Sequence, residues 1–477
     1  MKFIGQHDGA RLILTLTASL VLAGCNSAES RAEKAYGEYQ SAAAANDLPA
    51  ARRALLQLVA AKDDVADYWA QLGKVQLAMG AYEDAYQAFD RAHELDRSNP
   101  DFLRVLTEIA LRRGNIPIAQ AHARQLDIIA PGDRWVSLVS GHTALNERRF
   151  DDALRTSDAL LAATPFDSDG TLLKARALIG KDRQEDAVTL LQNHVRAQPA
   201  DVGSLRLLVK IYERKNDWRN VAHVAGSLSE SSRQDPEFAL LLIKAELRSG
   251  RFPEARRSSF RLLNSAGNPS LTSAVLDLWT TFWPSPQRLN DARKFARGAR
   301  SKEQKLAYAA FFNRVGSPKD AVALVAMDAG APVTAANVEA NAILADAVFH
   351  SGELSAAKTR FDAVLRFDAG NPTALRGRSE LRLQAGDARG AISDAQKLVS
   401  VLPKSPRDRL LLARCYRVAG NRAQEQRTLW DALQEIPADE HIFAALAATR
   451  RQDPDALRAL ELEFARQRDA QLNQGFV

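Results

Sequence analysis

Residues 66–99 read ADYWAQLGKVQLAMGAYEDAYQAFDRAHELDRSN, and this stretch decides the fold because much of the chain repeats its pattern. Within it, apolar residues recur at three- and four-residue steps, so each half presents one apolar face when it is helical. Gly80 lies between the two halves, where a residue in the left-handed conformation ends a helix at low cost. The stretch therefore predicts two α-helices joined by a tight turn.

The pattern returns at intervals of 34 residues. A residue near the start of each second helix marks this period, at Ala51, Ala85, Ala119, Ala153, Ala187, Val221 and Ala255, and again at Ala357, Ala391 and Glu425. One unit cannot bury its apolar face alone, so the units must stack to form a core. We expect an all-α solenoid of about 11–12 helix-turn-helix units. Its segments are a regular array over residues 32–269, irregular units over 270–337, a second array over 338–439 and capping helices over 440–477.

The unit over residues 66–99 resembles the tetratricopeptide repeat. The residues that carry this resemblance are Trp69, Leu72, Gly73, Gly80, Tyr82, Ala85, Phe89, Ala92 and Leu95. The turn residue between the two helices recurs as Gly114, Gly250, Gly352, Gly386 and Gly420, with Asn46 and Asn216 in the same place. The resemblance implies a right-handed superhelix whose first helices line a concave groove.

The amino-terminal segment has the pattern of an export signal. Lys2 and Arg11 precede an apolar run over residues 12–22, which is too short to anchor the chain across a bilayer. The run ends in Leu22-Ala23-Gly24-Cys25, which resembles the lipobox of bacterial lipoproteins. The resemblance implies a signal peptide over residues 1–24, cleavage between Gly24 and Cys25, acyl chains on Cys25 and a lipidated tether over residues 25–31.

The residue after the predicted acylation site is Asn26, where lipoproteins retained at the inner membrane commonly carry aspartate. The resemblance therefore implies a lipid-anchored protein of the outer membrane of a Gram-negative bacterium, facing the periplasm. Two or three acyl chains give lasting attachment, because each buried methylene contributes about 0.8 kcal/mol.

Composition and charge exclude some classes of partner. The chain has 64 Lys and Arg against 58 Asp and Glu, a formal net charge of +6, which is too mild to indicate a nucleic-acid partner. Its two cysteines are Cys25 and Cys415. Because the first has a role in lipidation and the second lies in a helical run, we expect no disulfide.

No pattern in the sequence predicts catalysis. Gly180-Lys181 lacks the upstream glycine of a phosphate-binding loop and is followed by aspartate. Asp346 and His350 lie four residues apart on one helical face, but two ligands do not make a zinc site. We expect no catalytic residues, no metal, no cofactor and no enzymatic activity.

Two groups of residues are candidates for partner binding. In the resembled family, fixed positions of the first helix face the groove. Over residues 168–269 these positions hold six basic residues, namely Arg176, Arg206, Lys210, Arg214, Lys244 and Arg248. Glu213 and Glu237 lie among them. They form either a basic stretch for an acidic peptide or anionic polymer, or a solvated charged face. Trp279, Phe282 and Trp283 form either the core of the irregular units or an aromatic partner patch.

Lipoproteins with such repeats resemble scaffold components of envelope machines. Exopolysaccharide synthesis and export, pilus assembly and outer-membrane protein insertion are the known classes, and the length of this array favours the first. The expected partners are other envelope proteins, and the membrane through the acyl chains on Cys25. Direct binding of an anionic polysaccharide or acidic peptide in the groove, or a role in pilus or outer-membrane assembly, are the alternatives.

Overall fold

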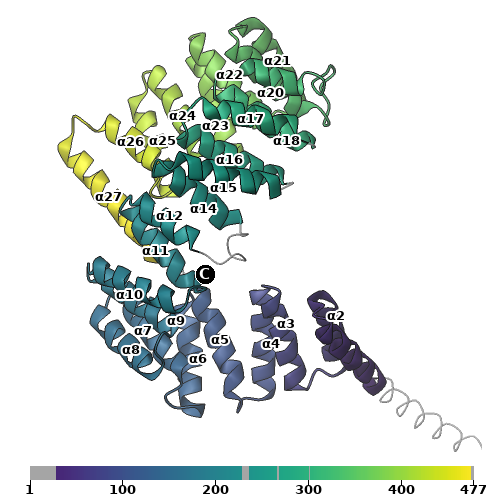
Figure 1. The fold of residues 1–477 in the computed structure, drawn as a ribbon, viewed down its shortest axis with the longest axis vertical. Helices are drawn as coiled ribbons and strands as arrows, with labels where there is room; N and C mark the ends of the chain where they lie inside the picture. Colours follow the sequence, from purple (N-terminus) through teal and green to yellow (C-terminus); the bar gives the residue numbers. More distant parts are fainter. Residues whose placement is uncertain (1–27, 228–235, 266–267, 300, 474–477) are drawn as a thin grey trace, which may run out of the picture. The chain divides into compact units, whose positions relative to one another are not determined.

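The computed structural model describes residues 28–227, 236–265, 268–299 and 301–473, and within these ranges it contains α-helices and no strand (Figure 1). The helices divide into two compact units, with the division between His194 and Val195. The all-α fold predicted from the repeat pattern is confirmed. Each unit is described below by itself.

Unit 1 begins with a helix over residues 28–44 and continues as a series of helix pairs. Its further helices are α2 (Leu48–Ala61), α3 (Ala66–Ala78), α4 (Tyr82–Leu95), α5 (Pro100–Arg112), α6 (Ile116–Ile129), α7 (Arg134–Asn146), α8 (Phe150–Ala163), α9 (Ser168–Gly180) and α10 (Gln184–Ala197). The division into units falls inside α10, where the sequence shows no change of pattern.

Unit 2 continues the same arrangement of helix pairs. Its helices are α11 (Val202–Arg214), α12 (Trp218–Gly226), α14 (Pro236–Arg248), α15 (Phe252–Ser265), α16 (Pro269–Phe282), α17 (Gln287–Arg297), α18 (Lys302–Arg314), α19 (Pro318–Val325), α20 (Val338–His350), α21 (Leu354–Phe367), α22 (Pro372–Gln384), α23 (Ala388–Val401), α24 (Pro406–Val418), α25 (Arg422–Glu435), α26 (Glu440–Thr449) and α27 (Pro454–Asn473). First helices also contact the first helices of adjacent pairs, as α20 contacts α22.

The turn inside each pair repeats one backbone conformation. The residue that closes the first helix has a positive φ at Asn46, Gly80, Gly114, Asn216, Gly250, Gly352, Gly386 and Gly420, as predicted. Arg148 and Asp182 occupy the same place with φ of 58° each, although the sequence pattern did not predict them. Arginine rarely adopts this conformation by itself, so its occurrence at Arg148 indicates that the geometry of the pair imposes it.

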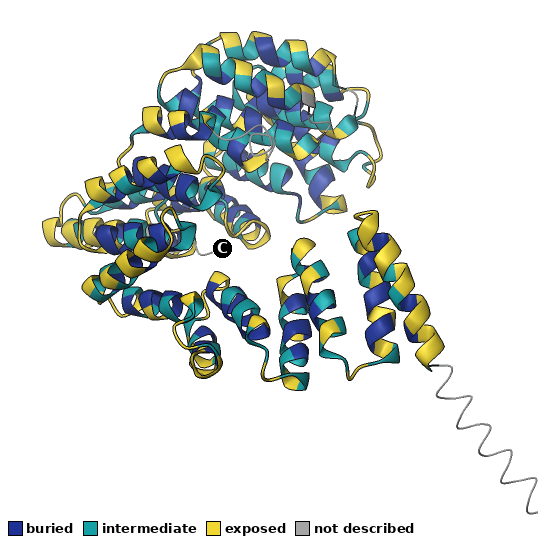
Figure 2. Ribbon diagram, turned by 60° about the horizontal axis from the view of Figure 1, so that its bottom comes forward, coloured by how far each residue is buried: buried dark blue, intermediate teal, exposed yellow. Residues whose placement is uncertain are grey.

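The core lies between helices whose small residues allow close approach, and Figure 2 shows buried and exposed residues on different faces of the helices. Nine of the ten residues that mark the period, all but Glu425, are apolar and at most 1% exposed. Glu425 is also buried, and it accepts a hydrogen bond of 2.7 Å from Nε of Arg417. A buried carboxylate with a charged donor thus replaces the small residue in that unit.

The irregular segment over residues 270–337 holds two short pairs, α16 with α17 and α18 with α19. Arg256 of α15 makes two hydrogen bonds to the buried Asp291 of α17, and Arg293 of α17 pairs with Asp320 of α19 at 2.8 Å. These charged pairs connect successive second helices.

The two tryptophans of this segment are buried in its core, so they do not form the aromatic surface patch that the sequence left open. Trp279 is fully buried and Trp283 is 3% exposed, with their rings edge to face at 5.1 Å. Nε1 of Trp279 donates to Oγ of Ser259 at 3.0 Å. Of the three predicted residues, Phe282 alone is half-buried and borders a cavity.

The last pair, α26 with α27, packs on α24 and α25 through an apolar core that includes Leu429, Ile442, Leu446 and Leu460. Within unit 2, α27 also contacts α11, which lies at the other end of the unit's sequence. The last pair of this unit therefore meets its first pair.

Gly24 and Cys25, the predicted cleavage and acylation site, lie outside the described residues. Within the described ranges, no helix combines the length and apolar character that crossing a membrane would require.

Candidate partner-binding site

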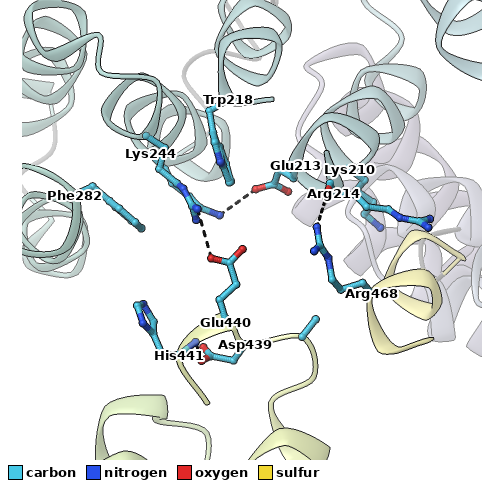
Figure 3. Close-up of a pocket in the computed structure, with 12 residues that line it drawn as sticks. Lys210, Glu213, Arg214, Trp218, Lys244, Phe282, Asp439, Glu440, His441 and Arg468 are labelled. Carbon is cyan, nitrogen blue, oxygen red and sulfur yellow. Dashed lines mark hydrogen bonds and ion pairs between the residues drawn. The ribbon is translucent and has the colours of Figure 1, made fainter. Parts of the chain in front are cut away.

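A cavity of about 540 Å³ lies in unit 2 between its first helices and its last pair (Figure 3). Four of the six predicted groove residues line it, namely Lys210, Arg214, Lys244 and Arg248. Trp218, Phe282 and Glu213 complete this wall. The spacing of positions on successive first helices therefore brought most of the predicted basic residues together.

Aromatic rings hold two of these cations. Cζ of Arg248 lies 4.3 Å from the ring centroid of Trp218 and 5.4 Å from that of Phe282. Nζ of Lys244 lies 4.9 Å from the same Trp218 ring and donates to Oε1 of Glu213 at 3.0 Å. Because a ring face attracts a cation, Trp218 fixes both charged groups at the cavity wall.

The opposite wall comes from the last helix pair and includes Asp439, Glu440, His441 and Arg468. Oε2 of Glu440 lies 3.4 Å from Nη2 of Arg248, an ion pair that crosses the cavity. Arg468 of α27 donates to the backbone carbonyl of Arg214, at the end of α11. These partners are 192 and 254 residues apart in sequence, so no local pattern could have predicted them.

The start of α26 is fixed by its own capping bonds. Asp439 is the N-cap, and its Oδ1 accepts from the backbone N–H groups of His441 at 3.0 Å and Ile442 at 2.9 Å. The N–H of Ala438 donates to Oε1 of Gln467 on α27 at 3.1 Å. Asp439 is therefore engaged within its own helix, and Glu440 is the carboxylate that reaches the basic wall.

Trp218 leaves one donor in this wall without an acceptor. The residue is 8% exposed, and its Nε1 has no hydrogen-bond partner within the described ranges. A buried N–H without an acceptor costs roughly 1–3 kcal/mol, so such groups in native proteins call for an explanation.

The other two predicted groove residues lie elsewhere. Arg206 pairs with Glu237 at 3.2 Å and covers the ring of Phe238 at 5.2 Å, outside the cavity wall. Arg176 belongs to unit 1 and is only 7% exposed, and its burial lowers its pKa to about 10. The prediction that Arg176 presents a charge to the groove is wrong, because neighbouring side chains cover that position.

Buried His142 precedes Arg176 by one repeat, in the equivalent place on its first helix. Burial, and then the charge of Arg176, lower the pKa of His142 to about 3. His142 is therefore neutral at pH 7 and belongs to the core of unit 1.

The described residues contain no group of three or more side chains arranged to hold a metal ion. Nε2 of His350 lies 3.5 Å from Oδ1 of Asp346, and the hydrogen bond to this carboxylate raises the pKa of His350. The pair is thus a local ion pair on α20.

Parts of the chain are similar to known repeat proteins. Residues 36–100 and 138–202 match the family model described as tetratricopeptide repeat. The TPR repeat-containing protein YpiA of Bacillus subtilis is 20% identical over 181 residues, which are 38% of this chain and 43% of YpiA. The chain thus spans less than half the length of this curated relative.

Two solved structures are also similar. A tetratricopeptide repeat protein from Parabacteroides merdae has a TM-score of 0.38 at 13% identity, covering 56% of this chain and 98% of that one. Yeast Tom70 has a TM-score of 0.31 at 12% identity, covering 93% of this chain and 94% of Tom70.

Proposed function

Because the chain carries tetratricopeptide repeats, we propose that it is a scaffold that binds other proteins and catalyses no reaction itself. The observation that carries the proposal is the cavity of unit 2, where cations held on aromatic rings face carboxylates and a half-buried Phe282. Aromatic and arginine side chains contribute most of the binding energy in many protein interfaces. The cavity thus offers a protein segment both anchoring rings and charged groups.

The charge of the cavity favours a protein over a polyanion. Glu213, Asp439 and Glu440 stand among its basic residues, and Lys244 and Arg248 each pair with one of these carboxylates. A glycan with an anionic group on every sugar would meet this negative charge along its whole length, whereas a protein segment can separate its carboxylates by uncharged residues. Direct binding of an anionic glycan therefore remains the second proposal.

For the location, we propose a lipid anchor at Cys25 in the outer membrane, facing the periplasm. The support is the sequence Leu22-Ala23-Gly24-Cys25 after an apolar run, with Asn26 next. Within the envelope, the length of the repeat array favours a role in exopolysaccharide synthesis and export over pilus assembly or outer-membrane protein insertion.

Crosslinking in living cells, followed by affinity capture from native membranes and mass spectrometry, tests this function. We expect recovery of synthase or outer-membrane export components, and loss of secreted polymer when the gene is deleted. Normal polymer together with defective pili would contradict the exopolysaccharide role.

A binding measurement across ionic strength tests the glycan alternative. Affinity for a purified anionic polysaccharide that falls steeply with salt, and with charge reversal at Lys210 and Lys244 of the cavity wall, would favour it. Binding that does not change with salt would reject it.

A further inference from the structure

We infer that the cavity of unit 2 is a recognition site for a carboxylate-rich peptide segment of a partner protein, and that Glu440 occupies this site in the free chain. The inference rests on the proposed scaffold function and adds the chemistry of the partner. It starts from Arg248, whose guanidinium lies between the rings of Trp218 and Phe282.

This placement prepares Arg248 for a carboxylate. A guanidinium presents its N–H donors in a fixed planar fork, and contact with two rings limits its rotation before any ligand arrives. Less conformational entropy is then lost on binding. The Arg248 side chain is 24% exposed, so its donors remain accessible from the cavity.

Glu440 shows which chemical group the site accepts. Its carboxylate approaches Arg248 at 3.4 Å, and its own side chain is 51% exposed. An ion pair exposed to this degree contributes little, because water screens it and two long side chains must be held in place. An external carboxylate can therefore replace Glu440 at small cost.

The site has more capacity than Glu440 uses. Asp439 is engaged as the N-cap of α26, so the last helix pair presents a single carboxylate to Arg248. Lys210, Arg214 and Lys244 line the same cavity, in addition to the one cation with which Glu440 pairs. A segment with two or more carboxylates gains contacts that Glu440 alone does not make.

The exchange leaves the last helix pair folded. Its attachment to α24 and α25 is apolar, through buried residues that include Leu446, Leu460 and Phe464, and Phe443 stacks on Phe464 at 4.2 Å. Its attachment to the basic wall includes the Glu440 ion pair and the Arg468 hydrogen bond. Loss of the Glu440 contact therefore exposes the site without unfolding α26.

The test is titration of the purified full chain with a fluorescent peptide of four Ala-Asp-Glu repeats. Glu440→Gln removes the internal competitor, so we expect about fivefold tighter binding, equivalent to about 1 kcal/mol. Arg248→Gln should weaken binding at least about tenfold, and Arg248→Lys, which keeps the charge without the planar fork, should fall between. Arg360→Gln is the matched control, since Arg360 is an exposed arginine of α21 outside the cavity wall.

Circular dichroism and urea unfolding establish that each variant is folded. If Arg248→Gln does not fold, the affinities of the two conservative variants Glu440→Gln and Arg248→Lys decide whether the inference holds. Unchanged affinity in Glu440→Gln, or equal effects of Arg248→Gln and Arg360→Gln, would overturn the inference. Tighter binding of a uronic-acid oligosaccharide with the same number of carboxylates would also overturn it. Capture of envelope partners together with a failed titration would reject this site and leave the scaffold function standing.

Discussion

Individual glycines set how closely neighbouring helices can approach, both within a pair and between adjacent pairs. A Cβ atom built on Gly377 would lie 2.2 Å from Cζ of Phe361, and one built on Gly73 would lie 2.6 Å from Cδ2 of Phe89. Both rings are among the fully buried side chains, so they have no room to move aside. These glycines are required for packing and not for backbone conformation.

Replacing Gly377 by alanine should therefore destabilise the α22–α21 crossing by about 1–3 kcal/mol, because the added methyl overpacks a filled core. Gly37→Ala is the control. Gly37 lies in the helix over residues 28–44 with open space at its Cβ, so alanine should stabilise that helix by about 0.5–1 kcal/mol. Urea unfolding monitored by circular dichroism measures both, and equal shifts in the two variants would contradict the packing argument.

His142 makes the stability of unit 1 depend on pH. Its pKa is about 3 in the folded chain against an ordinary value of 6.5. Above pH 6.5 the imidazole is neutral in both states, and its contribution is fully present. Below pH 6.5 the unfolded chain binds a proton that the folded chain does not, so stability falls, by roughly 2 kcal/mol at pH 5.

Hydrogen exchange of the α7 amides at pH 7.5 and pH 5.0, corrected for the intrinsic exchange rate, measures this loss. His142→Met should remove most of the pH dependence. His441→Gln, at an exposed histidine of unit 2, should leave the α7 pH dependence as it is. Equal pH dependence in the chain with and without His142 would show that other groups are responsible.

At the scale of helices, buried charged pairs join adjacent repeats. Nε and Nη2 of Arg376 on α22 donate to the two carboxylate oxygens of Asp408 on α24, at 2.7 and 2.9 Å. The Asp408 side chain is fully buried and that of Arg376 is 19% exposed. Because both hydrogen bonds must form together, this ion pair fixes the position of α22 along α24 as well as holding the two helices in contact.

Arg376→Met should destabilise the second array by about 3 kcal/mol, since it leaves the Asp408 carboxylate buried without its cation. The double variant with Asp408→Leu should recover much of this loss, because an apolar pair has no charge to desolvate. Thermal unfolding of the single and double variants measures the coupling. If the two single substitutions have additive effects, the pair does not act as a unit.

The sequence predicted the helices of this molecule well, but it did not predict which residues pair across the cavity. The 34-residue period located the closing residues at Gly80 and Gly352, because glycine and the periodic apolar face are both visible locally. Arg148 was missed because arginine rarely adopts a positive φ, and Asp182 was missed although aspartate tolerates this conformation better than most residues. In the predicted site, Lys244 and Arg248 were expected from the groove positions that the resemblance to the repeat family implies, but Glu440 belongs to a helix pair 192 residues further along.

The prediction for Arg176 failed, and the choice for Trp279 and Trp283 stayed open, for related reasons. A repeat register states which way a side chain leaves its helix, but not what covers it. Arg176 leaves α9 at a groove position and is nevertheless buried. Trp279 and Trp283 lie in a segment where the register is lost, so the sequence could not decide between core and surface, and the structure places both in the core.

At the scale of the whole molecule, the lipid anchor that we propose at Cys25 would attach the repeats to a membrane. Replacing Cys25 by serine should move the protein from the membrane to the soluble fraction, because the acyl chains have no thiol to attach to. Mass spectrometry of the wild-type chain should show the acyl mass on Cys25, and the circular dichroism of the two forms should agree. Membrane attachment that survives the substitution would disprove a lipid anchor at this residue.

The contacts of α11 and α14 with the last helix pair of unit 2 have a mechanical consequence. Neighbouring helix pairs form from local contacts, whereas the Arg248–Glu440 pair closes a loop of 192 residues, and loop closure of this length costs chain entropy. We therefore expect the Arg248–Glu440 contact to form after the repeats have stacked. Under tension we expect the Arg248–Glu440 ion pair to break first, at low force, while the apolar contacts between repeats still hold. Unit 2 should then extend elastically when a partner pulls on it, and shorten again without the unfolding of any helix.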